Sequence, residues 1–459
     1  MADHINHLPR VSAGSFQPVA SAPQPARIER PSDPAQTFAL GLGLVLLFLR
    51  TSMLHQLQAG LMGFNLRLLY VFGLPALLGV VLTGGVQRSF RGRPAFYWAG
   101  FAIWMAVATP FSIWRTGSAQ LFIDFLRTDL IMLFIIGGLV SSWRGCKLAM
   151  YTIAWGAVVN IFTSRLLGAG TQYGYRLGLE FGSISNPNDF SGHLLFTLPF
   201  LLWVVFSARS VVLRIAALLG VGYGIYAILL TASRGAALGL VAAMLFFLFR
   251  ARTGQRLVLL GLAPIVAVIL VAVVPHDSWR YLRSFSAAGD DVSLDAIDSM
   301  ESRQYLLRKS IQYTFQHPIV GVGPGQFAWY EGVNNRYGGT AHGSWHETHN
   351  TFTQVSSECG IPGFILYLCA IISTFRLVNA TYRQARLRPE CKDIAVAAFC
   401  IMLAMAGFVS AIFFLNFAYF FYLPALAGLA IALDRAAQAE FIQFQVGSGF
   451  RTAAASVGR

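Results

Sequence analysis

Long apolar stretches alternate with short polar connections along most of the chain. A helix needs about 20 mostly apolar residues to cross the hydrocarbon core of a bilayer. Twelve stretches approach that length, at residues 36–50, 68–84, 95–111, 121–141, 147–163, 190–207, 213–231, 235–249, 257–274, 360–378, 394–412 and 414–433. The pattern therefore predicts an all-α fold, a polytopic helical bundle of about 12 membrane spans.

One connection is much longer than the others. Residues 275–350, between the ninth and tenth predicted spans, hold five of the nine histidines. Apolar residues recur at helical spacing over 302–315, which predicts a helix there. His317-Pro318 is expected to end that helix. We expect this connection to be a large extramembrane loop with short helices.

These boundaries divide the chain into five regions. Residues 1–35 are rich in Pro, Ala and Ser and predict a disordered cytoplasmic tail. Spans 1–9 occupy residues 36–274 and spans 10–12 occupy residues 351–433, with the loop 275–350 between them. Residues 434–459 are expected to form a second cytoplasmic tail.

The composition excludes several classes of protein. Only 12% of the residues are charged and 56% are hydrophobic, whereas soluble globular chains carry about 25% charged residues. The mean hydropathy is +0.58. A cytoplasmic enzyme, a secreted disulfide scaffold and a disordered protein are therefore excluded.

The net charge of +14 has a topological explanation. Most basic residues lie between apolar stretches, where cytoplasmic loops collect Lys and Arg, so nucleic-acid binding is not expected. With the N-terminal tail inside, every second connection is rich in Arg, in agreement with the positive-inside rule. The same orientation puts the loop 275–350 on the outer face of the membrane.

Arg234 lies in a very short outer connection, residues 231–235, between two predicted spans. The planar guanidinium suits a phosphate or diphosphate and never deprotonates. The alternative is an arginine that snorkels to the interface. The positive-inside rule disfavours an unexplained Arg on this side.

A second outer arginine, Arg176, precedes residues 186–189, Asn-Pro-Asn-Asp. Asx side chains cap free N–H groups at a helix start, so residues 186–189 are expected to open the sixth span rather than to perform chemistry. Arg176 itself is open to both a substrate-binding and a structural interpretation.

The outer loop contributes Arg303 and a pair of histidines. Glu301-Ser302-Arg303 is expected to open the loop helix, where an arginine is unfavourable for the helix dipole and needs a partner, either an acid or the substrate. His349 can take a proton from a hydroxyl. The spacing of His346 and His349 also suits a metal, and a helix-capping role is the third interpretation.

Three charged residues fall inside the predicted span 121–141. Asp124, Arg127 and Asp129 could form a proton relay or a structural ion pair. The close helical spacing within the group favours the structural pair.

In order and placement, these motifs resemble the O-antigen ligase and polymerase superfamily of bacterial envelope glycosyltransferases. The likeness rests on residues 176–200, on Ser233-Arg234-Gly235, on residues 303–327, and on Thr348-His349-Asn350 with residues 358–363. It covers residues 170–375 closely, and the rest of the chain in span count and loop position.

The resemblance implies an inverting, metal-independent transfer, without a cofactor, of a glycan from undecaprenyl diphosphate at the periplasmic face of the inner membrane. The acceptor would be lipid A–core or a growing glycan. By this resemblance Arg234 helps to bind the diphosphate, Arg176 and Arg303 match further family arginines, and His349 activates the acceptor hydroxyl.

Several functions remain open at this point. The superfamily includes O-antigen ligases, polymerases of O-antigen or exopolysaccharide repeat units, and protein oligosaccharyltransferases. A polysaccharide or lipid transporter is the alternative from another class, although transporters usually show internal repeats and broken helices near the midplane. A structural scaffold of the envelope is a third.

Overall fold

The computed structural model of the 459-residue chain describes residues 33–165, 170–173, 176–179, 182–251, 294–334 and 345–457, with residues 256–257, 261, 264, 268, 271–276 and 278–279. Over these residues the fold is all-α, as predicted, apart from one two-stranded antiparallel hairpin. The predicted tail 1–35 and the predicted span 257–274 lie mostly outside the described residues.

The elements of the N-terminal part are α1 (Pro34–Ser52), α2 (Leu54–Met62), α3 (Leu68–Leu82), α4 (Gly85–Ser89), α5 (Arg93–Ala108), α6 (Arg115–Asp124), α7 (Ile131–Leu139), α8 (Trp143–Arg165), β1 (Gly170–Tyr173) and β2 (Arg176–Leu179). The C-terminal part contains α9 (Pro187–Ser207), α10 (Val211–Leu230), α11 (Arg234–Arg250), α14 (Leu294–Gln316), α15 (Phe327–Asn334), α16 (Thr351–Arg386), α17 (Lys392–Ala411) and α18 (Tyr422–Val457).

Each predicted span outside 257–274 overlaps at least one helix of the structure. Within the described residues, six helical segments are long and apolar enough to cross a membrane; they are α1, α8, α9, α10, α16 and Pro389–Phe414, which contains α17. The chain is therefore a membrane protein. The count of twelve spans stays a prediction, because α3, α5 and α11 are shorter, with 15, 16 and 17 residues.

Two helix starts differ from the sequence prediction. The twelfth predicted span starts at residue 414, but α18 starts only at Tyr422, with Pro424 in its first turn, where proline costs no hydrogen bond. The loop helix α14 starts at Leu294 rather than near Glu301, and ends at Gln316, directly before His317-Pro318 as predicted. Arg303 consequently lies in the middle of α14, so the predicted position in a first helical turn was wrong.

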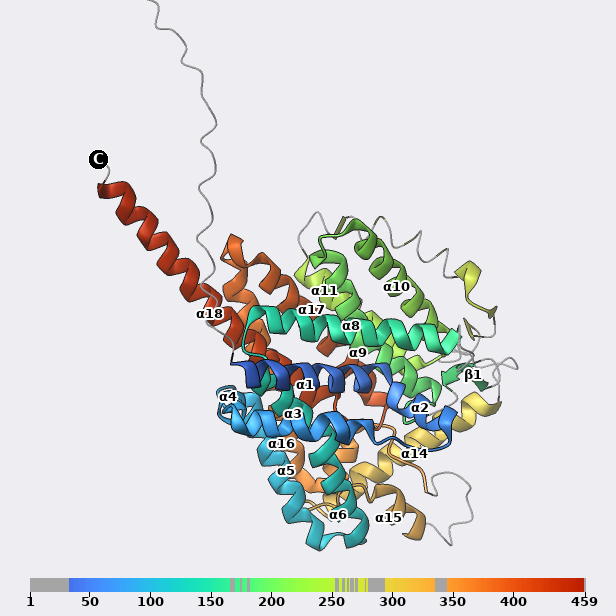
Figure 1. Cartoon of the computed structure of the whole chain (residues 1–459). Coiled ribbons are helices and arrows are strands. Elements are labelled where there is room, and N and C mark those ends of the chain that lie inside the picture. The colour runs from blue at the N-terminus through green and yellow to red at the C-terminus, as the bar shows by residue number, and fades with distance from the viewer. Residues whose placement is uncertain are drawn as a thin grey trace, which may run out of the picture.

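Helix α16 connects the bundle to the extramembrane part. It packs against α5, α17, α18 and α14. Elements α2, α14 and β1 lie toward one end of the molecule, and α18 extends away from the opposite end (Figure 1). The bundle has one large apolar core, and α14 and α15 share a second, smaller one formed by Leu306, Tyr313, Val322 and Phe327.

Two glycines allow the loop after α14 to lie directly against a kink in α16. Gly321 and Gly360 have φ values of +70° and +69°, a conformation that strongly favours glycine. A Cβ on Gly360 would lie 2.1 Å from the carbonyl oxygen of Ile319, so no larger residue fits. Backbone bonds join the two segments, with Val322 N donating to Ser357 O at 2.8 Å. This contact fixes the loop helices to the membrane bundle.

Candidate functional site

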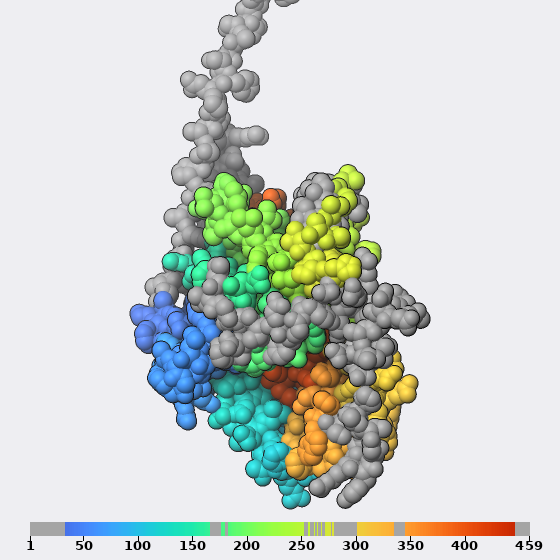
Figure 2. Space-filling model, turned by 90° about the vertical axis from the view of Figure 1, so that its right-hand side faces the viewer, coloured from blue at the N-terminus to red at the C-terminus, as the bar shows by residue number. Residues whose placement is uncertain are grey.

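A cavity of about 510 Å³ opens at the end of the bundle where α2 and the hairpin lie. Its walls come from the end of α1, the start of α9, the segment before α16 and the segment 415–421 before α18. Figure 2 looks onto this end, and red atoms from the C-terminal part of the chain are visible in a depression between cyan, green and orange segments. Residues that are far apart in the sequence therefore form one site.

His349 lines this cavity, and its neighbours fix its backbone. Its φ is +49°, a left-handed conformation that is uncommon for a residue with a side chain. On one side, the Thr348 hydroxyl donates to the Asn416 side chain at 3.2 Å. On the other, the Asn350 side chain caps α16 by accepting from two backbone N–H groups at 2.9 and 3.1 Å. Such strained residues are concentrated at functional sites.

The environment of His349 keeps its imidazole neutral. Burial lowers its pKa from 6.5 to about 4, with further contributions from the positive charge of Arg303 and from His346. A neutral imidazole at ordinary pH has a ring nitrogen that can accept a proton. His349 thus has the protonation state that a general base requires.

Arg303 is half-buried on α14 and interacts electrostatically with both His349 and Asp189. The sequence analysis expected Arg303 to have an acid or the substrate as its partner. Asp189, at the start of α9, is such an acid. Both His349 and Asp189 line the cavity. The structure thus brings the predicted base and one predicted arginine together.

Arg176 lies on β2 and links the hairpin to two other segments. Its Nε donates to the carbonyl oxygen of Thr231 at 2.9 Å, and its Nη2 donates to the Asn188 side chain at 2.8 Å. Asn188 lines the cavity. Asn186 caps α9, as predicted, by accepting from the backbone N–H of Asn188 at 2.8 Å. Arg176 therefore joins the cavity wall to the turn that leads to Arg234.

Arg234 is the first residue of α11, after the capping residue Ser233. The turn before it includes Ala232 at φ +49°. Arg234 is only 7% exposed. Because protein covers this side chain, its burial argues against an arginine that snorkels to the interface. Among the described residues, neither it nor Arg176 nor Arg303 lines the cavity, so the three arginines lie outside its wall.

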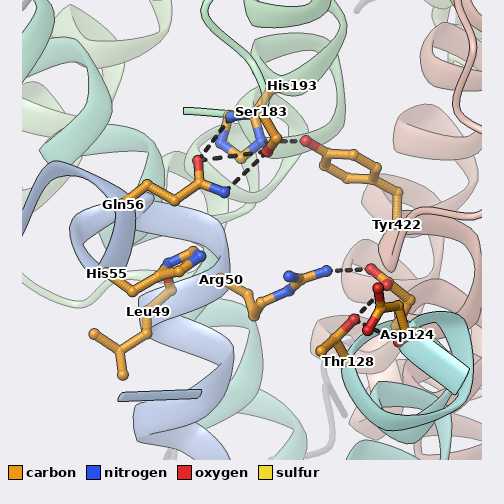
Figure 3. A network of polar contacts seen from close by, with 10 residues as sticks. Leu49, Arg50, His55, Gln56, Asp124, Thr128, Ser183, His193 and Tyr422 are labelled. Carbon is orange, nitrogen blue, oxygen red and sulfur yellow. Dashed lines mark hydrogen bonds and ion pairs between the residues drawn. The ribbon is translucent and has the colours of Figure 1, made fainter. Parts of the chain in front are cut away.

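The sequence analysis missed a second charged pair in the cavity. The predicted ion pair between Asp124 and Arg127 is present, but Asp129 pairs with Arg50 of α1 instead. Residues 125–130 form a π-helical turn, a feature that is frequent at functional sites. Arg50 points from α1 toward this acidic cluster, and Thr128 lies beside it (Figure 3). Both Arg50 and Asp129 line the cavity.

The rest of the polar network in Figure 3 supports the cavity wall. Gln56 of α2 donates to the Ser183 hydroxyl at 3.0 Å, and both residues line the cavity. Behind them, fully buried His193 forms hydrogen bonds to the Tyr422 hydroxyl and the Thr51 carbonyl oxygen, both at 2.9 Å. With both ring nitrogens bonded, His193 has a structural role.

The buried side chain of Glu358 joins three segments beside the cavity. It accepts from the Tyr419 hydroxyl at 2.7 Å and from the backbone N–H groups of Gly325 and Phe327 at 3.0 and 3.2 Å. Gly325 and Tyr419 line the cavity. Glu358 therefore connects α16, the loop after α14 and the segment before α18 at one point.

Part of the chain matches a known protein family. Residues 215–368 match the family model described as O-antigen ligase. This range includes Arg234, Arg303 and His349, whereas Arg176, Arg50 and Asp129 precede it. No curated protein gave a significant match. Residues 215–368 of this membrane protein are therefore similar to the O-antigen ligase family, and the resemblance to the O-antigen ligase and polymerase superfamily is confirmed.

Proposed function

We propose that this protein transfers a glycan from undecaprenyl diphosphate to an acceptor hydroxyl at the periplasmic face of the bacterial inner membrane. The observation that carries the proposal is His349: it lies in the family-matched range, lines a cavity beside Arg303, and is neutral at ordinary pH. A base and a cationic group are the two elements that transfer from a diphosphate donor requires.

The proposed reaction is a single displacement at the anomeric carbon. The acceptor oxygen attacks that carbon from the face opposite the diphosphate, its proton passes to His349, and the bond between the anomeric carbon and the diphosphate oxygen breaks. Attack from the opposite face inverts the configuration. Undecaprenyl diphosphate leaves with the electron pair, and no metal is needed in this scheme.

We assign the diphosphate to Arg176, Arg234 and Arg303. Guanidinium groups bind phosphate oxygens through two parallel hydrogen bonds. Arg176 also anchors the turn before Arg234, through its bond to Thr231. The acceptor is proposed to be lipid A–core, as in an O-antigen ligase.

A reconstitution experiment tests this function. Purified full-length protein in liposomes receives labelled undecaprenyl-diphosphate glycan, with lipid A–core in one sample and only further donor in the other. Label on lipid A–core is the expected result. A ladder of longer lipid-linked glycans would instead identify a polymerase, and label that crosses the bilayer without transfer would identify a transporter.

The pH dependence of transfer provides a test of the base. Because the His349 pKa is lowered to about 4, the imidazole stays neutral at higher pH, and kcat is expected to fall only as the pH drops through about 4. Arg303→Gln removes a positive charge that lowers this pKa, so the acid limb should move to higher pH. The midpoint of the limb is read independently of the absolute rate. An unchanged midpoint in Arg303→Gln would refute the electrostatic link.

A further inference from the structure

The charged groups that line the cavity differ from those assigned to the diphosphate. Within the described part of the chain, its walls contain the acidic side chains Asp129, Asp189 and Glu347 and a single arginine, Arg50, which is already paired with Asp129. The arginines assigned to the diphosphate lie outside this lining. Arg303 still interacts with His349 and Asp189 of the wall, so the cavity adjoins the proposed diphosphate site.

Two residues that line the cavity, Gln354 and Arg50, each have a buried polar atom without a partner among the described residues. Gln354 lies in the first turn of α16 and is 5% exposed, and its Oε1 accepts no hydrogen bond from any described residue. The Nε of Arg50 likewise has no partner among the described residues. Buried groups of this kind are normally satisfied. One is an acceptor and the other a donor, so a ligand that both donates and accepts would satisfy the two.

Aromatic rings provide the apolar part of the same wall. Tyr419, Phe420 and Phe421 line the cavity. The guanidinium of Arg50 lies over the Phe421 ring, 4.5 Å from its centroid, which holds the Arg50 side chain in place. A sugar ring matches this combination, since it has C–H groups for aromatic faces and hydroxyls that donate and accept.

We propose that the cavity is a subsite for a hydroxyl-rich sugar residue, in which Gln354 Oε1 accepts from one hydroxyl and Arg50 Nε donates to another. The inference rests on the proposed function, since His349 lies in the same wall. A volume of about 510 Å³ is within the usual range of small-molecule sites.

The test uses Gln354→Leu, which removes the amide while retaining a side chain of similar size. The matched control is Gln384→Leu on the same helix, where the side chain accepts from Gln438 far from the cavity. Initial rates are measured in proteoliposomes with the native lipid-linked glycan and acceptor. We expect Gln354→Leu to raise KM for one substrate about tenfold or more, with kcat changed less than about threefold, and Gln384→Leu to leave both unchanged.

The substrate whose KM rises identifies the source of the sugar. A rise for the acceptor places an acceptor sugar in the cavity, and a rise for the donor places a donor sugar there. Equal KM values for wild type and Gln354→Leu, for both substrates, would overturn the subsite.

A binding measurement separates this inference from the proposed function. The glycan is released from its lipid, and its effect on the thermal unfolding of the purified full-length protein is recorded. We expect it to raise the Tm of wild type and of Gln384→Leu but not of Gln354→Leu. If the Tm values follow this pattern but no glycan transfer is observed, the subsite is supported and the proposed transferase function is refuted. An equal rise in all three proteins, or no rise in any, would refute the subsite even if transfer occurs.

Discussion

Replacing His349 by alanine is expected to stop glycan transfer, with kcat lowered by about 10²- to 10⁴-fold, the usual contribution of a general base. The expectation follows from the position of the imidazole in the cavity wall and from its neutral state. Transfer is measured as a single turnover of labelled donor in proteoliposomes, so that product release does not mask the chemical step.

Donor binding should survive in His349→Ala, because the proposed diphosphate ligands are arginines. Retention of labelled undecaprenyl-diphosphate glycan by the purified variant measures this directly. The matched control is His346→Ala, an exposed histidine in the same segment, which should retain most of the activity. Full activity in His349→Ala would refute the assignment of His349 as the base. A larger loss of activity in His346→Ala than in His349→Ala would refute it as well.

The second large effect is expected at Arg234, where even a conservative change should be costly. Arg234→Lys keeps the charge but loses the planar fork of donors. The side chain is buried and follows a turn with a left-handed residue, so a lysine has little freedom to find another geometry. We expect kcat/KM for the donor to fall roughly 30- to 150-fold. This loss corresponds to an increase of about 2–3 kcal/mol in the activation free energy.

The opposite end of helix α11 provides a control for Arg234. Arg250 is the last residue of α11, and its Nη2 donates to the Asn379 side chain at 2.9 Å. Arg250→Lys should leave transfer near the wild-type level. A normal donor KM in Arg234→Lys, together with normal turnover, would contradict diphosphate binding by Arg234.

Features that depend on local sequence could be predicted. Apolar runs indicated the helices of the bundle, because length and hydropathy are read directly along the chain. The Asp124–Arg127 ion pair followed from helical spacing, and the capping role of Asn186 followed from Asx chemistry. The end of α14 at His317-Pro318 followed from the geometry of proline.

Features that depend on packing could not be predicted. Asp129 was assigned to its neighbours in sequence, but the π-helical turn and the fold pair it with Arg50 from another helix. The hairpin that carries Arg176 was not predicted, although the glycine-containing segment between two short runs was a possible signal. Gln354 gave no signal, because only the closed cavity wall leaves its amide oxygen without a partner.

The Arg50–Asp129 ion pair shows how the cavity is divided along the chain. Both residues precede the matched range 215–368, whereas His349 and Gln354 lie within it. The proposed sugar subsite is thus assembled from two stretches of the chain. A protein that retains only residues 215–368 is expected to lack the Arg50 side of this subsite.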